Sequence, residues 1–108
     1  MKILNYTGKR IGLTNRAGNP IEVIPSDGHA HCEIEIKEQL IIGRTPIYNK
    51  DLGKVRGLPA PDLNLENIYI VTADVAEAIG HTRKDLIVPA NPFHYEGATF
   101  YKLLLRAS

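Results

Sequence analysis

Residues 30–37 alternate between two kinds of side chain, and this alternation limits the possible folds more than any other feature of the chain. Small or apolar residues hold the even positions, and polar or charged residues hold the odd ones. A period of two is typical of a β-strand, because successive side chains point to opposite faces. We expect Ala30, Cys32, Ile34 and Ile36 to face the core and the polar set to face water, as in an antiparallel sheet covered on one side.

Most of the remaining sequence predicts further short strands separated by turns. Residues 49–51 and 89–92 are expected to end strands, because Asn-Lys-Asp favours a reversal and prolines interrupt a sheet. The last strand is expected at an exposed edge, where it could pair with another chain. The candidate strands are residues 3–6, 10–14, 21–24, 40–42, 45–48, 54–56, 68–71, 86–88 and 99–106.

One short helix is expected at about residues 73–80. Thr72 can cap its first turn, Asp74 suits the positive end of the helix dipole, and Gly80 ends it. Many strands with a single helix do not fit a parallel βαβ sheet, which needs repeated crossover helices. We therefore expect one α+β, mainly β domain over residues 1–108, as a small antiparallel β-barrel or a two-layer sheet with one helix.

Net charge, cysteine content and the length of apolar runs argue against several classes of function. The 108 residues have a net charge of +1, which gives no overall basic excess for gripping nucleic acid. Cys32 is the only cysteine, so an intramolecular disulfide is excluded and a reducing cytoplasm is expected. The first ten residues do not read as a signal peptide, and no apolar run approaches the ~20 residues of a membrane span.

The second half of the chain reads G-x-V-x-G-L-P-x-P, then I-Y-I-V, V-A-x-A, R-x-D and a proline. This pattern resembles a family of small uncharacterised proteins from bacteria, archaea and their phages, and the opening Asn-Tyr-Thr is similar to the family's N-L-T. After residue 89 the sequence departs from the family's acidic, glycine-rich tail. The resemblance implies a prokaryotic or phage setting, with the host cytoplasm as the compartment in the phage case. The matching residues are Asn5, Tyr6, Thr7, Gly53, Val55, Gly57, Leu58, Pro59, Pro61, Ile68, Tyr69, Ile70, Val71, Val75, Ala76, Ala78, Arg83, Asp85 and Pro89.

Catalytic and metal-binding signals are weak. His29 and His31 have a spacing that can ligate a metal. A complete site would need a third and a fourth ligand from Glu33, His81 or His94, and the spacing of these residues does not require them to meet. A solvated polar row is therefore the preferred interpretation. Cys32 lies in the inward register, where a free cysteine usually acts as a small hydrophobe. Phosphate-loop, dinucleotide-binding and nucleophile-elbow motifs do not occur. We expect no catalytic residues, metal or cofactor.

Basic and aromatic side chains supply the leading functional hypothesis. Arginine forks bind phosphate or carboxylate, and tyrosine rings stack on bases. The predicted ligand-binding set is Arg44, Tyr48, Arg56, Arg83 and Tyr95. These residues would surround one small anionic or nucleotide-like ligand if the fold brings the arginines together.

Three functions therefore follow, in order of preference. The first is a non-enzymatic protein that captures a small phosphorylated or nucleotide-like ligand. The second is a structural, assembly or protein-interaction protein, and homo-oligomers fit either hypothesis. The third is a small enzyme that pairs His29, His31 or His94 with a carboxylate.

Overall fold

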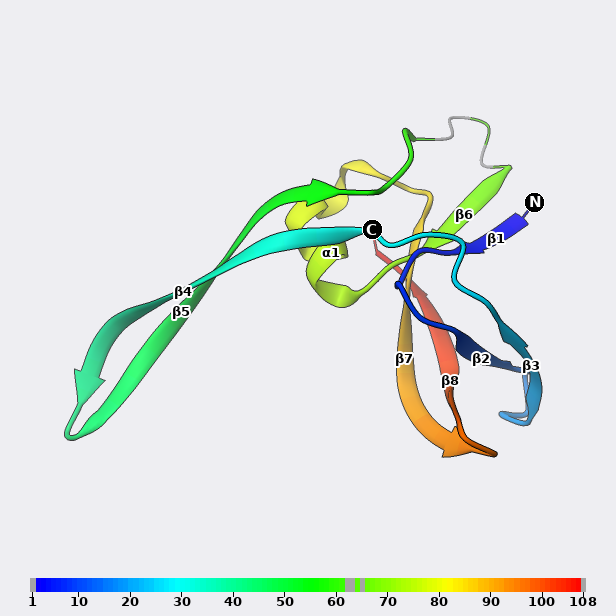
Figure 1. Ribbon diagram of the computed structural model, residues 1–108, viewed down its shortest axis with the longest axis horizontal. Coiled ribbons are helices and arrows are strands. Elements are labelled where there is room, and N and C mark those ends of the chain that lie inside the picture. Colours follow the sequence, from blue (N-terminus) through cyan, green and yellow to red (C-terminus); the bar gives the residue numbers. More distant parts are fainter. Residues whose placement is uncertain (1, 62–63, 65, 108) are drawn as a thin grey trace.

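The computed structural model describes residues 2–61, 64 and 66–107, and strands predominate in this part of the chain (Figure 1). Helix α1 (Ala73–Ile79) and a 3-10 turn, η1 (Gly80–Thr82), lie between the sixth and seventh strands. The prediction of a mainly β, α+β fold with one short helix is confirmed. The strands are β1 (Lys2–Asn5), β2 (Ile11–Thr14), β3 (Pro20–Ile24), β4 (His31–Ile42), β5 (Thr45–Arg56), β6 (Asn67–Ile70), β7 (Leu86–Tyr95) and β8 (Ala98–Arg106).

Six strands form one sheet that curls into a nearly closed barrel, in the order β1-β6-β7-β8-β2-β3. Ile11 of β2 and Ile70 of β6 are three places apart in this order, yet they pack together with Ile87 of β7. Their contact requires the sheet to bend until distant strands face each other. This apolar cluster therefore fills the inside of the curl.

Helix α1 covers the outer face of the same sheet. Val75 of the helix is buried against Tyr69, Val71 and Leu86. Tyr69 and Val71 flank Ile70 in sequence, so they point to the opposite side of β6 from the inner cluster. Residues of β6 thus pack into apolar clusters on both sides of the sheet, which explains why this strand has no polar face.

The sheet is mixed, whereas the sequence predicted an antiparallel one. The pairs β1–β6, β6–β7 and β2–β8 are parallel, and β2–β3 and β7–β8 are antiparallel. Parallel neighbours require a crossover, which α1 supplies between β6 and β7. Strand β8 lies between β7 and β2, so the predicted exposed edge at residues 99–106 is wrong, and β1 and β3 form the edges instead.

Strand β7 continues through residues 89–92, where the sequence predicted a break. The neighbour on one side, β6, pairs only with Leu86 and Ile87, while β8 follows β7 as far as Tyr95. Pro89 and Pro92 therefore lie beyond the end of β6, where one side of β7 has no ladder to interrupt.

Strands β4 and β5 leave the body of the protein as a long twisted hairpin, which we call the arm (Figure 1). Each strand has 12 residues, and the turn at Gly43 joins them at the tip. The radius of gyration is 16.1 Å, above the ~13 Å expected for a compact chain of this length. The difference reflects the arm, since the longest dimension is 49 Å and the shortest is 20 Å.

The arm overturns two expectations from the sequence. Residues 49–51 do not form a turn, because they lie within β5 and pair with residues 35–37 of β4. Ile34 and Ile36 do not face the core, because they are largely exposed on the arm. Of the alternating apolar set, Ala30 is buried and Cys32 is half-buried.

The helix begins and ends close to the predicted positions. Thr72 holds the N-cap position and Gly80 the C-cap, with a positive φ of 76° that favours glycine. The Thr72 side chain makes no capping hydrogen bond, contrary to the expected role of its hydroxyl. The α1 helix is too short to cross a membrane, and no other helix is present in the described part of the chain to do so.

Candidate functional site

The pairing of β4 with β5 sorts the arm's side chains onto two faces. Directly paired residues share a face, and faces alternate along each strand. On one face, which we call the apolar face, the register gives five successive cross-strand rows. From the base to the tip, these rows are Cys32–Val55, Ile34–Leu52, Ile36–Lys50, Glu38–Tyr48 and Ile41–Pro46.

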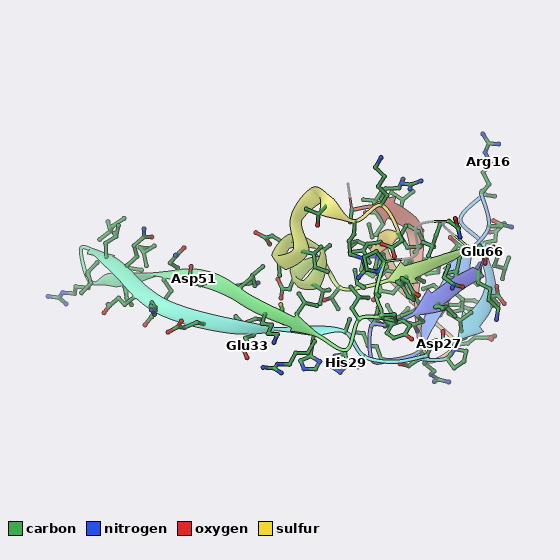
Figure 2. All side chains as sticks on the ribbon, turned by 90° about the horizontal axis from the view of Figure 1, so that it is seen from above. Arg16, Asp27, His29, Glu33, Asp51 and Glu66 are labelled. Carbon is green, nitrogen blue, oxygen red and sulfur yellow. The ribbon has the colours of Figure 1, made fainter. Side chains whose placement is uncertain are left out.

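The opposite face changes character along the arm. Near the base it carries charged and polar pairs, such as Glu35–Asp51 and His31–Arg56. Figure 2 shows Glu33 and Asp51 along the arm and His29 near its base. A register shift after Glu38 leaves one extra residue in β4, and beyond it Leu40 pairs with Ile47 on this face. The distal third of the arm is therefore apolar on both faces.

Large apolar side chains on the arm are exposed to water to an unusual extent. Ile36 is 63% exposed and Tyr48 59%. Seven large apolar side chains of the arm are exposed, four on the apolar face and three on the opposite face towards the tip, and exposed apolar patches of this kind mark interaction sites. The side chains are Ile34, Ile36, Leu40, Ile41, Ile42, Ile47 and Tyr48.

Helix α1 packs against the base of the arm only. Val55 is half-buried against the core cluster that contains Val75, and Leu52 is also half-buried. Lys50 Nζ donates to Asp74 Oδ1 at 2.6 Å, which ties the middle of β5 to the first turn of the helix. This hydrogen bond raises the pKa of Lys50 above its ordinary value of 10.5, and the nearby Glu77 carboxylate adds to the rise. Beyond Lys50 the apolar face is open.

Three predicted ligand-binding residues lie on the arm, but far from one another. Arg44 is in the turn at the tip, and Arg56 ends β5 at the base. Twelve residues of extended strand separate them, about 40 Å at ~3.3 Å per residue. Tyr48 lies between them on the apolar face. One small ligand cannot contact both arginines.

Arg83 and Tyr95 lie elsewhere in the structure. Arg83 is almost buried beneath the helix, where it pairs with Asp85 and stands 5.9 Å from the centre of the Tyr69 ring. Tyr95 ends β7 and packs edge-on against Phe100 at 5.9 Å. The fold therefore places the five predicted residues at several separate positions and not around one concavity.

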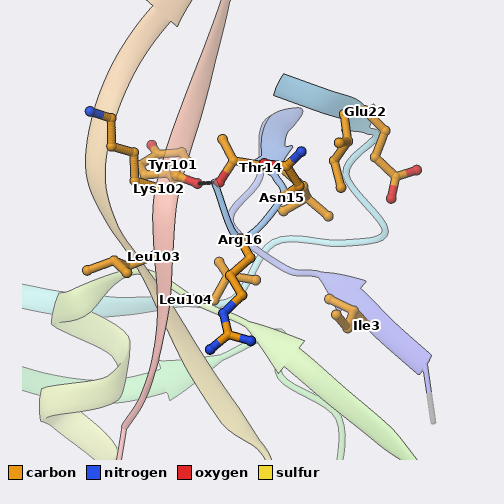
Figure 3. A pocket seen from close by; sticks show the side chains of 11 residues that line it. Ile3, Thr14, Asn15, Arg16, Glu22, Tyr101, Lys102, Leu103 and Leu104 are labelled. Carbon is orange, nitrogen blue, oxygen red and sulfur yellow. Dashed lines mark hydrogen bonds between the residues drawn. The ribbon is translucent and has the colours of Figure 1, made fainter. Parts of the chain in front are cut away.

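A groove of about 460 Å³ lies at the open side of the curled sheet, between β1 and the strands β2, β3 and β8. Ile3, Leu13, Ile21 and Leu104 give it an apolar wall, and Arg16 also lines it (Figure 3). Local sequence patterns do not indicate this groove, because its wall is built from strands distant in the chain.

His29 and His31 lie together at the base of the arm, and His94 lies on β7. The rings of His29 and His31 are 5.2 Å apart, and His94 shares a hydrogen bond of 3.3 Å with Thr99. These three make no ion pair with a described carboxylate. Among the described residues, no group of three or more His, Cys, Asp or Glu side chains could hold a metal ion.

Comparison with known proteins gives no functional assignment. No family model, no curated protein and no solved structure matches this chain. The functional argument therefore depends on the geometry of the molecule alone.

The exposed apolar arm is the feature that sequence reasoning missed. Its alternation was identified, but a buried face and a face awaiting a partner give the same pattern. One feature of the sequence indicates the arm. Leu40, Ile41 and Ile42 are consecutive, and successive residues of a strand point to opposite faces, so burial of one face cannot cover all three.

Proposed function

We propose that this chain is a non-enzymatic interaction protein that binds another protein subunit through the arm. The supporting observation is that seven large apolar side chains of β4 and β5 are exposed to water, because exposed apolar patches mark interaction sites. An isolated two-stranded hairpin is marginally stable in water, so a partner would also stabilise the arm.

The test compares two variants that carry the same substitution on different surfaces. Ile36→Glu places a charge on the arm, and Ile21→Glu places one on β3, where the native side chain is 58% exposed against 63% for Ile36. Each variant and the wild type are immobilised and exposed to an extract of the cells that express the chain. Proteins that bind the wild type and Ile21→Glu, but not Ile36→Glu, support the proposal.

Two results would overturn this proposed function. One is that all three immobilised proteins retain the same binding partners. The other is that the wild type retains no more protein than blank resin and also fails to associate with itself. Circular dichroism checks that both variants keep the wild-type strand content, because both side chains are already exposed.

Capture of a small anionic ligand is the second candidate, now restricted to the base of the arm. There Arg56 pairs with His31, whose ring is next to that of His29. Calorimetric titration with a panel of nucleotides and phosphorylated sugars tests it. Arg56→Ala should abolish binding, and Arg44→Ala, about 40 Å away along the strand, should leave it unchanged. Absence of heat with every member of the panel rejects this candidate.

A further inference from the structure

Four rows of the apolar face form a short, two-stranded surface, which α1 reaches through the bond between Lys50 and Asp74. From the base outward they are Ile34–Leu52, Ile36–Lys50, Glu38–Tyr48 and Ile41–Pro46. The two outer rows are wholly apolar, and each of the two inner rows carries one charge. The charges, on Glu38 and Lys50, have opposite signs and lie in adjacent rows.

This arrangement is complementary to itself when reversed. If two such surfaces face each other in opposite directions, the row of Ile34 meets the row of Ile41, and the row of Ile36 meets the row of Glu38. Apolar rows then cover apolar rows, and Lys50 of each chain shares its level with Glu38 of the other. Such pairing of a patch with itself is the property of a twofold interface.

We infer that the occupant of the arm's apolar face is a second copy of this chain, with the two arms packed face to face and antiparallel. This inference rests on the proposed function and names its partner. On the apolar face each arm contributes four exposed large side chains, Ile34, Ile36, Ile41 and Tyr48. The paired arms would therefore cover these side chains of both copies, as the apolar core of a specific interface requires.

The same arrangement gives Arg44 a partner. In an antiparallel pair, the tip of each arm lies one row beyond Ile41 and reaches the base of the other arm, which α1 covers. The helix presents acidic side chains there: Asp74 bonds to Lys50, and the exposed Glu77 is near enough to raise the pKa of that lysine. Arg44 of one copy thus approaches Glu77 of the other, which adds an ion pair at each end of the interface.

The first experiment measures the mass of the purified chain by sedimentation equilibrium across a concentration series. The wild type should form a particle of twice the 12.0 kDa chain mass. Ile36→Glu should weaken dimerisation more than tenfold, because it removes an apolar contact and places a carboxylate at the level of Glu38 of the other copy. The matched control Ile21→Glu should dimerise like the wild type.

The second experiment reverses the charges at the ends of the interface. Arg44→Glu should weaken the dimer, and the double variant Arg44→Glu, Glu77→Arg should restore it, because the pair is remade with opposite polarity. Arg44 lies in an exposed turn, so its substitution leaves the fold intact. The control Arg16→Glu, in the exposed turn after β2, should not change the dissociation constant.

Each contrary outcome overturns the inference. A wild-type chain that stays monomeric at several hundred micromolar excludes the second copy as the occupant, while arm-dependent binding from the extract would still support the proposed function. Equal loss of dimer in Ile36→Glu and Ile21→Glu places the interface elsewhere. Failure of Glu77→Arg to rescue Arg44→Glu rejects the antiparallel arrangement, and an oligomer larger than a dimer rejects twofold pairing.

Discussion

Arg83 and Asp85 face each other in the interior of the protein and are joined by two parallel hydrogen bonds. Nε of Arg83 donates to Oδ1 of Asp85 at 3.0 Å, and Nη2 donates to Oδ2 at 2.7 Å. The third donor, Nη1, reaches the main-chain oxygen of Pro59 at 2.8 Å. The pair therefore connects the start of β7 to the segment that leaves the arm.

Replacing Arg83 with methionine should destabilise the protein by about 3–5 kcal/mol, because it leaves the Asp85 carboxylate buried without its charged partner. Urea unfolding measures the change. The double variant Arg83→Met, Asp85→Leu removes both charges and should recover most of the loss. Wild-type stability in Arg83→Met alone would show that the pair does not stabilise the fold.

Gly57 is expected to tolerate no side chain. Its φ is +81°, and an added Cβ would overlap the main-chain oxygen of His29 at the base of the arm. Gly57→Ala should therefore cost more than the ~1–2 kcal/mol of a left-handed residue alone. Gly43→Ala at the tip is the control, because its φ is +63° and its Cβ would meet open space. Equal losses of unfolding free energy in the two variants would contradict the predicted clash.

Asn5 is a buried centre of hydrogen bonds near the N-terminus. Its amide nitrogen donates to the main-chain oxygens of Lys9 and Pro25 at 2.7 and 3.2 Å, and its oxygen accepts from the main-chain N–H and the hydroxyl of Thr7. Asn5→Asp cannot donate to those two carbonyls and should cost about 3 kcal/mol. Thermal melting measures this loss. Asn19→Asp in the exposed turn before β3 is the control and should change stability by less than ~0.5 kcal/mol.

The bond between Lys50 and Asp74 should make the contribution of Lys50 to stability depend on alkaline pH. The folded pKa of Lys50 lies above the unfolded value of 10.5, so its stabilising effect is complete below pH 10.5 and is lost as the pH rises through the folded pKa. Melting temperatures of wild type and Lys50→Met, taken from pH 7 to 12, should differ by a constant amount until the pH approaches 10.5 and should converge above it. A difference that is absent at pH 7 would show that the pair contributes nothing.

Several local features of the fold were predictable because their causes lie within a few residues. Thr72 and Gly80 bound the helix as expected. The run 68–71 was correctly interpreted as a buried strand from its β-branched residues. In each case a short-range property, such as a positive φ or a side-chain period, was sufficient.

The candidate site could not be predicted in the same way, because it depends on which segments pair. The arginines at positions 44 and 56 were expected to meet, and the single strand Thr45–Arg56 holds them apart. No local signal distinguishes this long strand from two short ones joined by a turn at residues 49–51. The pairing of β5 with β4 decides that residues 45–56 form one strand.

The sequence by itself determined that this chain forms many strands, one short helix and an alternating segment beginning at Ala30. Only the tertiary structure decided that most of this alternating segment leaves the body and carries Ile34 and Ile36 into water. The physical reason is that alternation records only that two faces differ. Which face is buried, and whether this chain or another covers it, depends on contacts between residues far apart in the sequence.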